Sequence, residues 1–203
     1  MSSRDEQKEQ RRQLIISKAL ELFAKKGYSD TKIGDIAKAA DMSAGLMFHY
    51  FESKEQLYEE LVKMGAESTN IPQKLNFENP LDFFEKFLNT LFSYAKEQPW
   101  VFYMFVLMAQ ARSNEGIPPH IKEIALGVDQ VEQSAEIIKA GQQYGYFRAG
   151  DPYTLSFTFW SSVQGIMEQL AVSPEMAEND RLPETDWIID IIRGTKNTTG
   201  GSQ

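Results

Sequence analysis

Apolar residues recur at intervals of three and four along most of the chain, a spacing that places them on one face of a helix. The first such face, between Leu14 and Phe23, predicts a helix over about residues 5 to 26. Gly27 follows where the pattern stops, and a glycine in this place is typical of a helix end. The chain therefore opens with a helix of several turns.

Two short helix patterns and the start of a longer one follow in close succession. Thr31 can cap the first, and Ser43 can cap the second, which extends from Ala44 to about Tyr50. Ser53 and Gln56 have the spacing of a capping box at the start of a fourth helix. Helices as short as these are stable only when they pack on their neighbours, so we expect a compact three-helix module.

The remaining chain repeats the helical pattern. We expect helices between Pro80 and Pro99, over about residues 100 to 112, in the long segment from His120 to Tyr144, from Pro152 to Val172 with Asp151 or Thr154 as its cap, and from Glu184 to Arg193. No stretch has a convincing strand pattern, so the expected fold class is all-α, with an N-terminal helix-turn-helix domain followed by a larger helical domain. We place these domains at residues 1–54 and 55–194, and a flexible tail at 195–203.

Charge is distributed unevenly between the two domains. The 203 residues include 21 basic and 29 acidic ones, a formal net charge of -8. Residues 1–54 hold 10 basic and 8 acidic residues, a net of +2, which leaves a net of -10 for residues 55–203. A uniformly basic nucleic-acid coat protein is therefore disfavoured, and the two parts are expected to have different partners.

The sequence offers little of the chemistry that enzymes and metal sites use. It has no cysteine and only two histidines, and it lacks both a Gly-x-Ser-x-Gly elbow and a phosphate-binding glycine loop. We expect no enzyme, metal site or cofactor, with carboxylate-only chemistry as the alternative left open. The polar start of the chain and the absence of a long apolar run predict a cytoplasmic protein without a membrane segment.

Two short helices joined by a turn are typical of a helix-turn-helix, although many helical cores contain the same corner. The residues themselves are more specific. The string from Gly27 to Ala37, together with that from Ala40 to Leu57, resembles the amino-terminal domain of the TetR family of transcriptional repressors. The resemblance covers about residues 12 to 62, and the rest of the chain is similar only in being helical and of suitable length.

The resemblance implies a set of DNA contacts in the first domain. Its members are Thr31, Lys32, Ser43, Ala44, Gly45, Leu46, His49, Tyr50 and Lys54. Thr31, Lys32, His49, Tyr50 and Lys54 match positions that contact phosphates, whereas Ser43, Ala44 and Gly45 open the helix that faces the bases. In the competing interpretation the lysines and His49 are ordinary surface residues and Tyr50 belongs to the core.

Several positions depart from the family pattern. Asp41 stands where the family often has Gly, Ala44 where it often has Lys or Pro, and Phe48 where it has a Tyr whose hydroxyl meets a phosphate. Leu46 replaces a residue that is commonly Thr, which suggests contact with a thymine methyl group.

The second domain is rich in aromatic residues and methionines, which suit an apolar or aromatic effector as well as an ordinary core. Candidate effector contacts are Phe84, Phe87, Tyr103, Met104, Met108, Phe157, Trp160, Gln164 and Glu168. The acidic balance also allows a cationic effector, with Glu168 as its partner or simply as a solvent-facing residue.

A single short recognition helix reads few base pairs, and the resemblance implies a dimer built from the last two long helices. Candidate interface residues are Phe159, Val163, Ile166, Met167, Trp187 and Ile191. The sequence thus predicts a repressor that binds a palindromic operator as a homodimer and responds to a small molecule. The alternative is a helical protein-binding adaptor without a DNA function.

Overall fold

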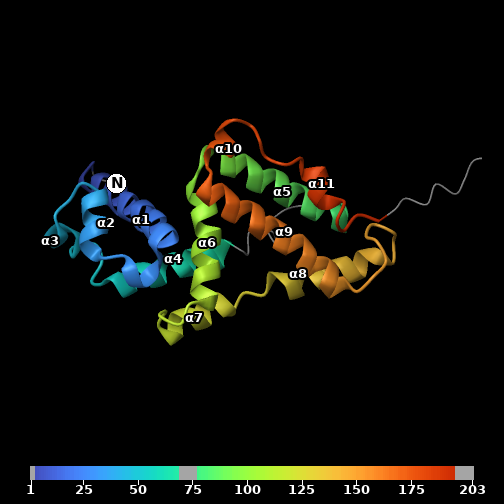
Figure 1. The fold of residues 1–203 in the computed structure, drawn as a ribbon, viewed down its shortest axis with the longest axis horizontal. Coiled ribbons are helices and arrows are strands. Elements are labelled where there is room, and N and C mark those ends of the chain that lie inside the picture. The colour runs from blue at the N-terminus through green and yellow to red at the C-terminus, as the bar shows by residue number, and fades with distance from the viewer. Residues whose placement is uncertain (1–2, 69–76, 195–203) are drawn as a thin grey trace, which may run out of the picture. The chain divides into compact units, whose positions relative to one another are not determined.

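The chain is described over residues 3–68 and 77–194 by a computed structural model, and over these ranges it is built from helices (Figure 1). They are α1 (Ser3–Asp30), α2 (Ile33–Ala39), α3 (Ala44–Met47), α4 (Lys54–Ser68), α5 (Pro80–Glu97), α6 (Trp100–Ser113), α7 (Pro119–Leu126), α8 (Gln130–Gln142), α9 (Pro152–Val172), α10 (Glu175–Glu178) and α11 (Thr185–Ile189). The all-α prediction is confirmed. The tail predicted at 195–203 lies outside the described residues.

The helices form two compact units. One contains α1 to α4 together with α6 and α7, and the other contains α5 and α8 to α11. The division between these units does not fall at residue 54, because α4 and α6 pack on α1, and α7 packs on α4 and α6. The assignment of residues 1–54 as a separate functional domain stays a prediction.

In the first unit α1 packs on α6, and α4 packs on both α6 and α7. Phe23, Tyr28 and Tyr58 form an aromatic cluster between α1 and α4, with ring centroids 4.8 to 6.1 Å apart. Tyr58 is fully buried, and burial raises the pKa of its hydroxyl. This apolar cluster fixes the start of α4 against the end of α1.

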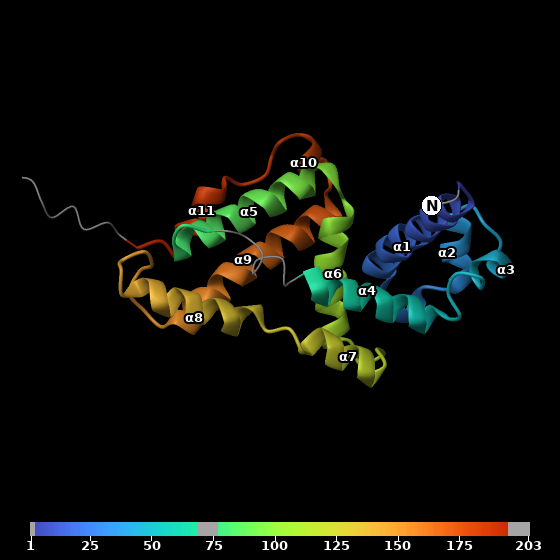
Figure 2. The same ribbon diagram turned by 180° about the vertical axis from the view of Figure 1, so that it is seen from behind.

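In the second unit α8 and α9 lie side by side, as both ribbon views show (Figures 1 and 2). The ring of Phe84 on α5 makes edge contacts with Phe147 and Phe159 at centroid distances of 5.6 and 5.0 Å. The indole N–H of Trp160 donates to the hydroxyl oxygen of Ser134 over 2.9 Å, which satisfies the one polar group of this buried ring. Aromatic rings therefore form the core of this unit.

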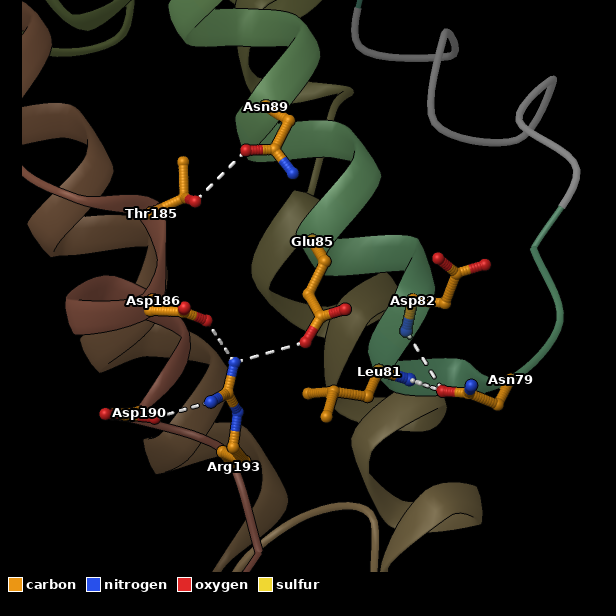
Figure 3. Close-up of polar contacts among 9 residues, drawn as sticks. All are labelled: Asn79, Leu81, Asp82, Glu85, Asn89, Thr185, Asp186, Asp190 and Arg193. Carbon is orange, nitrogen blue, oxygen red and sulfur yellow. Dashed lines mark hydrogen bonds and ion pairs between the residues drawn. The ribbon is translucent and has the colours of Figure 1, made fainter.

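A polar network joins α11 to α5 (Figure 3). The guanidinium of Arg193 lies 3.2 Å from the Glu85 carboxylate, 3.2 Å from Asp190 and 2.5 Å from Asp186. One turn further along α5, the hydroxyl of Thr185 donates to the Asn89 side-chain oxygen over 3.0 Å. Three carboxylates around one arginine hold the short last helix in place.

Helix ends follow the predicted capping residues with one exception. The Ser43 hydroxyl accepts from the backbone N–H of Leu46 over 3.2 Å, and Ser53 accepts from that of Gln56 over 3.0 Å, as predicted. Asp151 caps α9, accepting from the Thr154 backbone N–H over 2.8 Å. The prediction for Thr31 is wrong, because α2 begins after Lys32 and has no side-chain cap.

Other boundaries also differ from those predicted. The long segment from His120 to Tyr144 forms two helices, α7 and α8, because Asp129 caps a new helix start by accepting from the Glu132 N–H over 2.9 Å. The last helix is shorter than predicted and covers only Thr185–Ile189. None of the helices in the described ranges has the length and apolarity needed to cross a membrane.

Candidate nucleic-acid interface

At the corner between α2 and α3, one face of α3 is buried against the module and the other face is exposed to solvent. Met47 and Phe51 are essentially fully buried and anchor this segment to the module. The Ser43 cap fixes the first turn. Asp41, in the connecting turn, has φ of 53°, a left-handed conformation that explains why glycine suits this position.

The opposite face of α3 is open. Ser43, Ala44 and Gly45 are exposed, Leu46 is half-buried, and Phe48 is 51% exposed. A Cβ atom added to Gly45 would meet only the Ser43 hydroxyl oxygen, at 4.0 Å. The backbone at Gly45 can therefore approach another surface closely, as the sequence predicts.

Thr31 and Lys32 have opposite environments. Thr31 is fully buried, and its hydroxyl donates to the Gly27 carbonyl oxygen over 2.7 Å. Gly27 has φ of 81° and interrupts α1, so the carbonyls at this helix end need new donors. This corrects the expectation that Thr31 contacts a phosphate, whereas Lys32 is exposed just before α2.

His49 and Tyr50 lie at the edge of the α3 face. His49 is exposed and Tyr50 is half-buried. Together with residues of α1 they line a surface hollow of about 310 Å³, whose lining is Asp5, Lys8, Glu9, Arg12, His49 and Tyr50. The hollow contains two basic groups of α1 that the sequence analysis did not assign to it. These residues are brought together by the fold alone, because they are about 40 positions apart in the sequence.

Lys54 points back into the protein. Its ammonium group donates to the Tyr28 carbonyl oxygen over 2.7 Å and lies 3.5 Å from that of Ser29. It also lies 4.2 Å from the centroid of the Tyr28 ring. The ammonium thus supplies the donors that the last carbonyls of α1 need, and it is not presented to the surface as a free phosphate contact.

Three candidate effector residues belong to the first unit. Tyr103, Met104 and Met108 are buried on α6. A Cβ atom at Gly65 of α4 would lie 2.5 Å from the Met108 sulfur and 2.9 Å from the Met104 sulfur. These methionines therefore fill the close contact between α4 and α6.

The other six candidates belong to the second unit. Phe84 is fully buried and Phe87 packs on Trp160 with a centroid distance of 5.1 Å. Phe157 is 54% exposed, and the exposed Glu168 accepts from the Gln164 amide over 2.8 Å. Glu168 therefore faces solvent.

A second surface hollow, which the sequence analysis did not anticipate, follows α5 and has a volume of about 500 Å³. It is lined by Asn89, Thr90, Ser93, Tyr94 and Glu97. Its lining combines one aromatic ring with polar groups, and none of these residues was a candidate effector contact.

The candidate interface residues separate into core and surface. Phe159, Val163 and Met167 are fully buried within the second unit, so they cannot contact a partner, and this part of the expectation is corrected. Ile166 and Ile191 are half-buried and Trp187 is 67% exposed. On α9 the helical spacing identified an apolar face but could not distinguish the core from an interface.

Comparison with known proteins relates the α2–α3 corner to bacterial transcriptional regulators. Residues 15–61 match the family model described as bacterial regulatory proteins, tetR family. The chain is 28% identical over 165 residues to the uncharacterized HTH-type transcriptional regulator YuxN of Bacillus subtilis, covering 78% of this chain and 53% of that protein. It is 41% identical over 49 residues to the negative transcriptional regulator IcaR of the biofilm operon icaADBC in Staphylococcus aureus, covering 24% of this chain and 26% of IcaR.

Solved structures share the fold across most of the chain. The MbdR regulator of Azoarcus sp. CIB has a TM-score of 0.71 at 20% identity, over 90% of this chain and 97% of MbdR. AibR in complex with isovaleryl coenzyme A and operator DNA has a TM-score of 0.63 at 17% identity, over 89% and 94%. The match to YuxN spans about half of that protein, so the likeness is firmest over residues 15–61, which contain the whole α2–α3 corner.

Proposed function

We propose that the chain is a member of the TetR family of bacterial regulatory proteins, and that it is a transcriptional repressor that binds a palindromic operator as a homodimer. The observation that carries the proposal is the open face of α3. Gly45 exposes its backbone there, while the Ser43 cap and the buried Met47 hold the helix in position. A preorganised helix with one bare face fits the major groove of B-DNA.

The residues at the corner that are not fully buried divide into two roles. Ser43, Ala44, Gly45 and Leu46 face the bases, and Lys32, His49 and Tyr50 contact flanking phosphates. IcaR is named as a negative regulator, which supports repression, and this function places the chain in the cytoplasm with the chromosome.

We propose that the effector is a small apolar or aromatic molecule, with a cationic group as one option. The aromatic core of the second unit supports an apolar ligand, and the net charge of -10 over residues 55–203 supports a cation. AibR was solved with a small molecule and operator DNA together, which supports control by an effector. Binding of the effector favours a conformation that releases DNA.

The test is fluorescence anisotropy with labelled duplexes from the DNA that flanks the gene for this chain. We expect saturable binding to a duplex with an inverted repeat and weak binding to a scrambled duplex of the same length. Lys32→Ala should weaken binding to both and lower the salt-dependence slope by about 0.9 for each lysine removed, about two per dimer.

The matched control is Lys139→Ala, which removes an exposed lysine from α8 in the second unit. It should leave the affinity and the slope unchanged. If the native protein bound no duplex even at low ionic strength, the adaptor interpretation would replace the repressor.

A further inference from the structure

The open face of α3 is almost free of hydrogen-bonding side chains. Residues 43 to 48 read Ser, Ala, Gly, Leu, Met and Phe, and the single methionine is buried. Ser43 is the one residue among them with a hydroxyl, and its oxygen already accepts the backbone N–H of Leu46 over 3.2 Å. This face cannot make the paired hydrogen bonds by which Arg, Lys, Asn or Gln distinguish guanine and adenine.

What the face does offer is apolar surface. The backbone N–H of Phe48 donates to the Ala44 carbonyl over 3.3 Å, so these residues are one helical turn apart and lie on the same side. Phe48 is 51% exposed, and Leu46, two positions earlier and on the other side of the exposed Gly45, is half-buried. Removing this large aromatic ring from water, by covering it with a partner, lowers the free energy and so favours binding.

The surroundings determine which partner fits. Lys32, just before α2, and His49, shortly after α3, are both exposed and suit a polyanion. The only apolar group on the major-groove edges of the four base pairs is the C5 methyl of thymine. We infer that Ala44, Leu46 and Phe48 read thymine methyl groups, and that sequence recognition by α3 depends on these contacts; this rests on the proposed DNA-binding function.

Deoxyuridine gives a direct test, because it lacks the methyl group of thymine and keeps its hydrogen-bonding edge. The operator is first selected from a random duplex pool with the native full-length protein. Each thymine of one half-site is then replaced by deoxyuridine, and the dissociation constant is measured by anisotropy. We expect roughly fourfold weaker binding for each thymine methyl group removed from beneath α3, as for one buried methylene, and no change at thymines outside the footprint of α3.

Variants assign the contacts to side chains. Phe48→Ala and Leu46→Ala should each weaken binding to the thymine duplex, and each should abolish the effect of deoxyuridine at one position. Phe77→Ala is the matched control, because Phe77 is a similarly exposed phenylalanine, 46% exposed, in the second unit. Phe77→Ala should change neither the affinity for the thymine duplex nor that for the deoxyuridine duplex.

The outcomes separate the inference from the function on which it rests. Equal affinity for thymine and deoxyuridine duplexes at every position, with the intact operator still bound, would overturn the methyl readout and leave the repressor in place. Failure to select or bind any duplex would overturn the repressor itself. The deoxyuridine measurement uses the native protein, so it stands even if a variant fails to fold.

Discussion

The position of the Lys54 ammonium changes the role expected for this residue. Two carbonyl oxygens at the end of α1 and the Tyr28 ring surround it, and Lys54 is only half-buried. Hydrogen bonds from a charged donor to carbonyls left open at a helix end stabilise the fold, and they are broken if the lysine turns to a phosphate. We therefore expect Lys54 to influence DNA binding only through the position of α4.

Lys54→Met tests this role, because methionine keeps much of the aliphatic stem beside Tyr28 and removes the donors. We expect the free energy of unfolding to fall by about 1 kcal/mol, while the salt-dependence slope of DNA binding stays unchanged. Urea unfolding and anisotropy at several salt concentrations measure the two quantities. Lys32→Ala should show the reverse: a lower slope and a stability change within about 0.5 kcal/mol. A lower slope for Lys54→Met would restore the phosphate contact.

Asp41 carries backbone strain in the turn before α3. Its φ of 53° is a conformation that glycine adopts without the steric cost that a Cβ atom brings. Asp41→Gly should therefore raise the free energy of unfolding by up to about 1 kcal/mol, seen as a higher urea midpoint at unchanged m-value. Asp41→Asn removes the charge and keeps the Cβ atom, so it should gain less. An equal gain in both variants would assign the effect to charge.

At the scale of elements, sequence predicted which segments are helical better than where they begin. Ser43 and Ser53 are correctly predicted as helix caps, because the nearest unpaired backbone N–H groups for each hydroxyl are those of the first turn of the helix that follows it. Thr31 lies between two helices, and its hydroxyl serves the end of α1 instead of the start of α2. That choice depends on the break at Gly27, whose geometry is a property of the folded chain.

The same limit applies to the candidate sites. The exposed start of α3 followed from a local pattern, whereas the inward direction of Lys54 depends on contacts 25 and 26 residues away in sequence. On α9 the apolar spacing marks an inward face, but both Phe157 and Phe159 belong to the apolar pattern. Only packing in the second unit shows that Phe159 is core and Phe157 is surface.

Asp151 gives α9 a stability that depends on pH. Its hydrogen bonds from the Thr154 hydroxyl and then from the Thr154 backbone N–H hold the pKa of the Asp151 carboxyl below its ordinary value. A lowered folded-state pKa means that this contribution is present above the unfolded pKa, near 3.8, and is lost as pH falls through the folded value. Helix α9 should therefore lose part of its N-terminal support in acid.

Asp151→Asn isolates this effect, because asparagine also caps helices but does not titrate. Thermal midpoints of both proteins are compared at pH 7 and at pH 3. We expect the thermal midpoint of the native protein to fall further between pH 7 and pH 3 than that of the variant, because only the native protein has a titrating carboxylate at this cap. Identical losses would show that the cap does not depend on the charge of the carboxylate.

At the scale of the whole molecule, the outward face of α9 offers a surface for self-association. Tyr153, Phe157 and Val172 are exposed along it. Ser161 and Gly165 between them are small and exposed, and a Cβ atom at Gly165 would meet nothing within 4 Å. Aromatic groups beside small residues allow two copies of a helix to approach closely, and this face replaces the buried Phe159, Val163 and Met167 as the expected interface.

Light scattering should give a mass of about twice 23.2 kDa for the native protein. Phe157→Glu places a charge at the centre of the proposed interface and should raise the dimer dissociation constant by at least about thirtyfold, the effect of losing 2 kcal/mol at an interface hot spot. Tyr144→Glu, at an exposed aromatic beyond α8, is the control and should leave the mass unchanged. Because the proposed readout by each α3 covers only a few base pairs, the monomeric variant should also lose most of its operator affinity while its salt-dependence slope falls by about half. A dimeric Phe157→Glu protein would assign the interface elsewhere, and a native monomer would remove the physical basis for reading a palindrome.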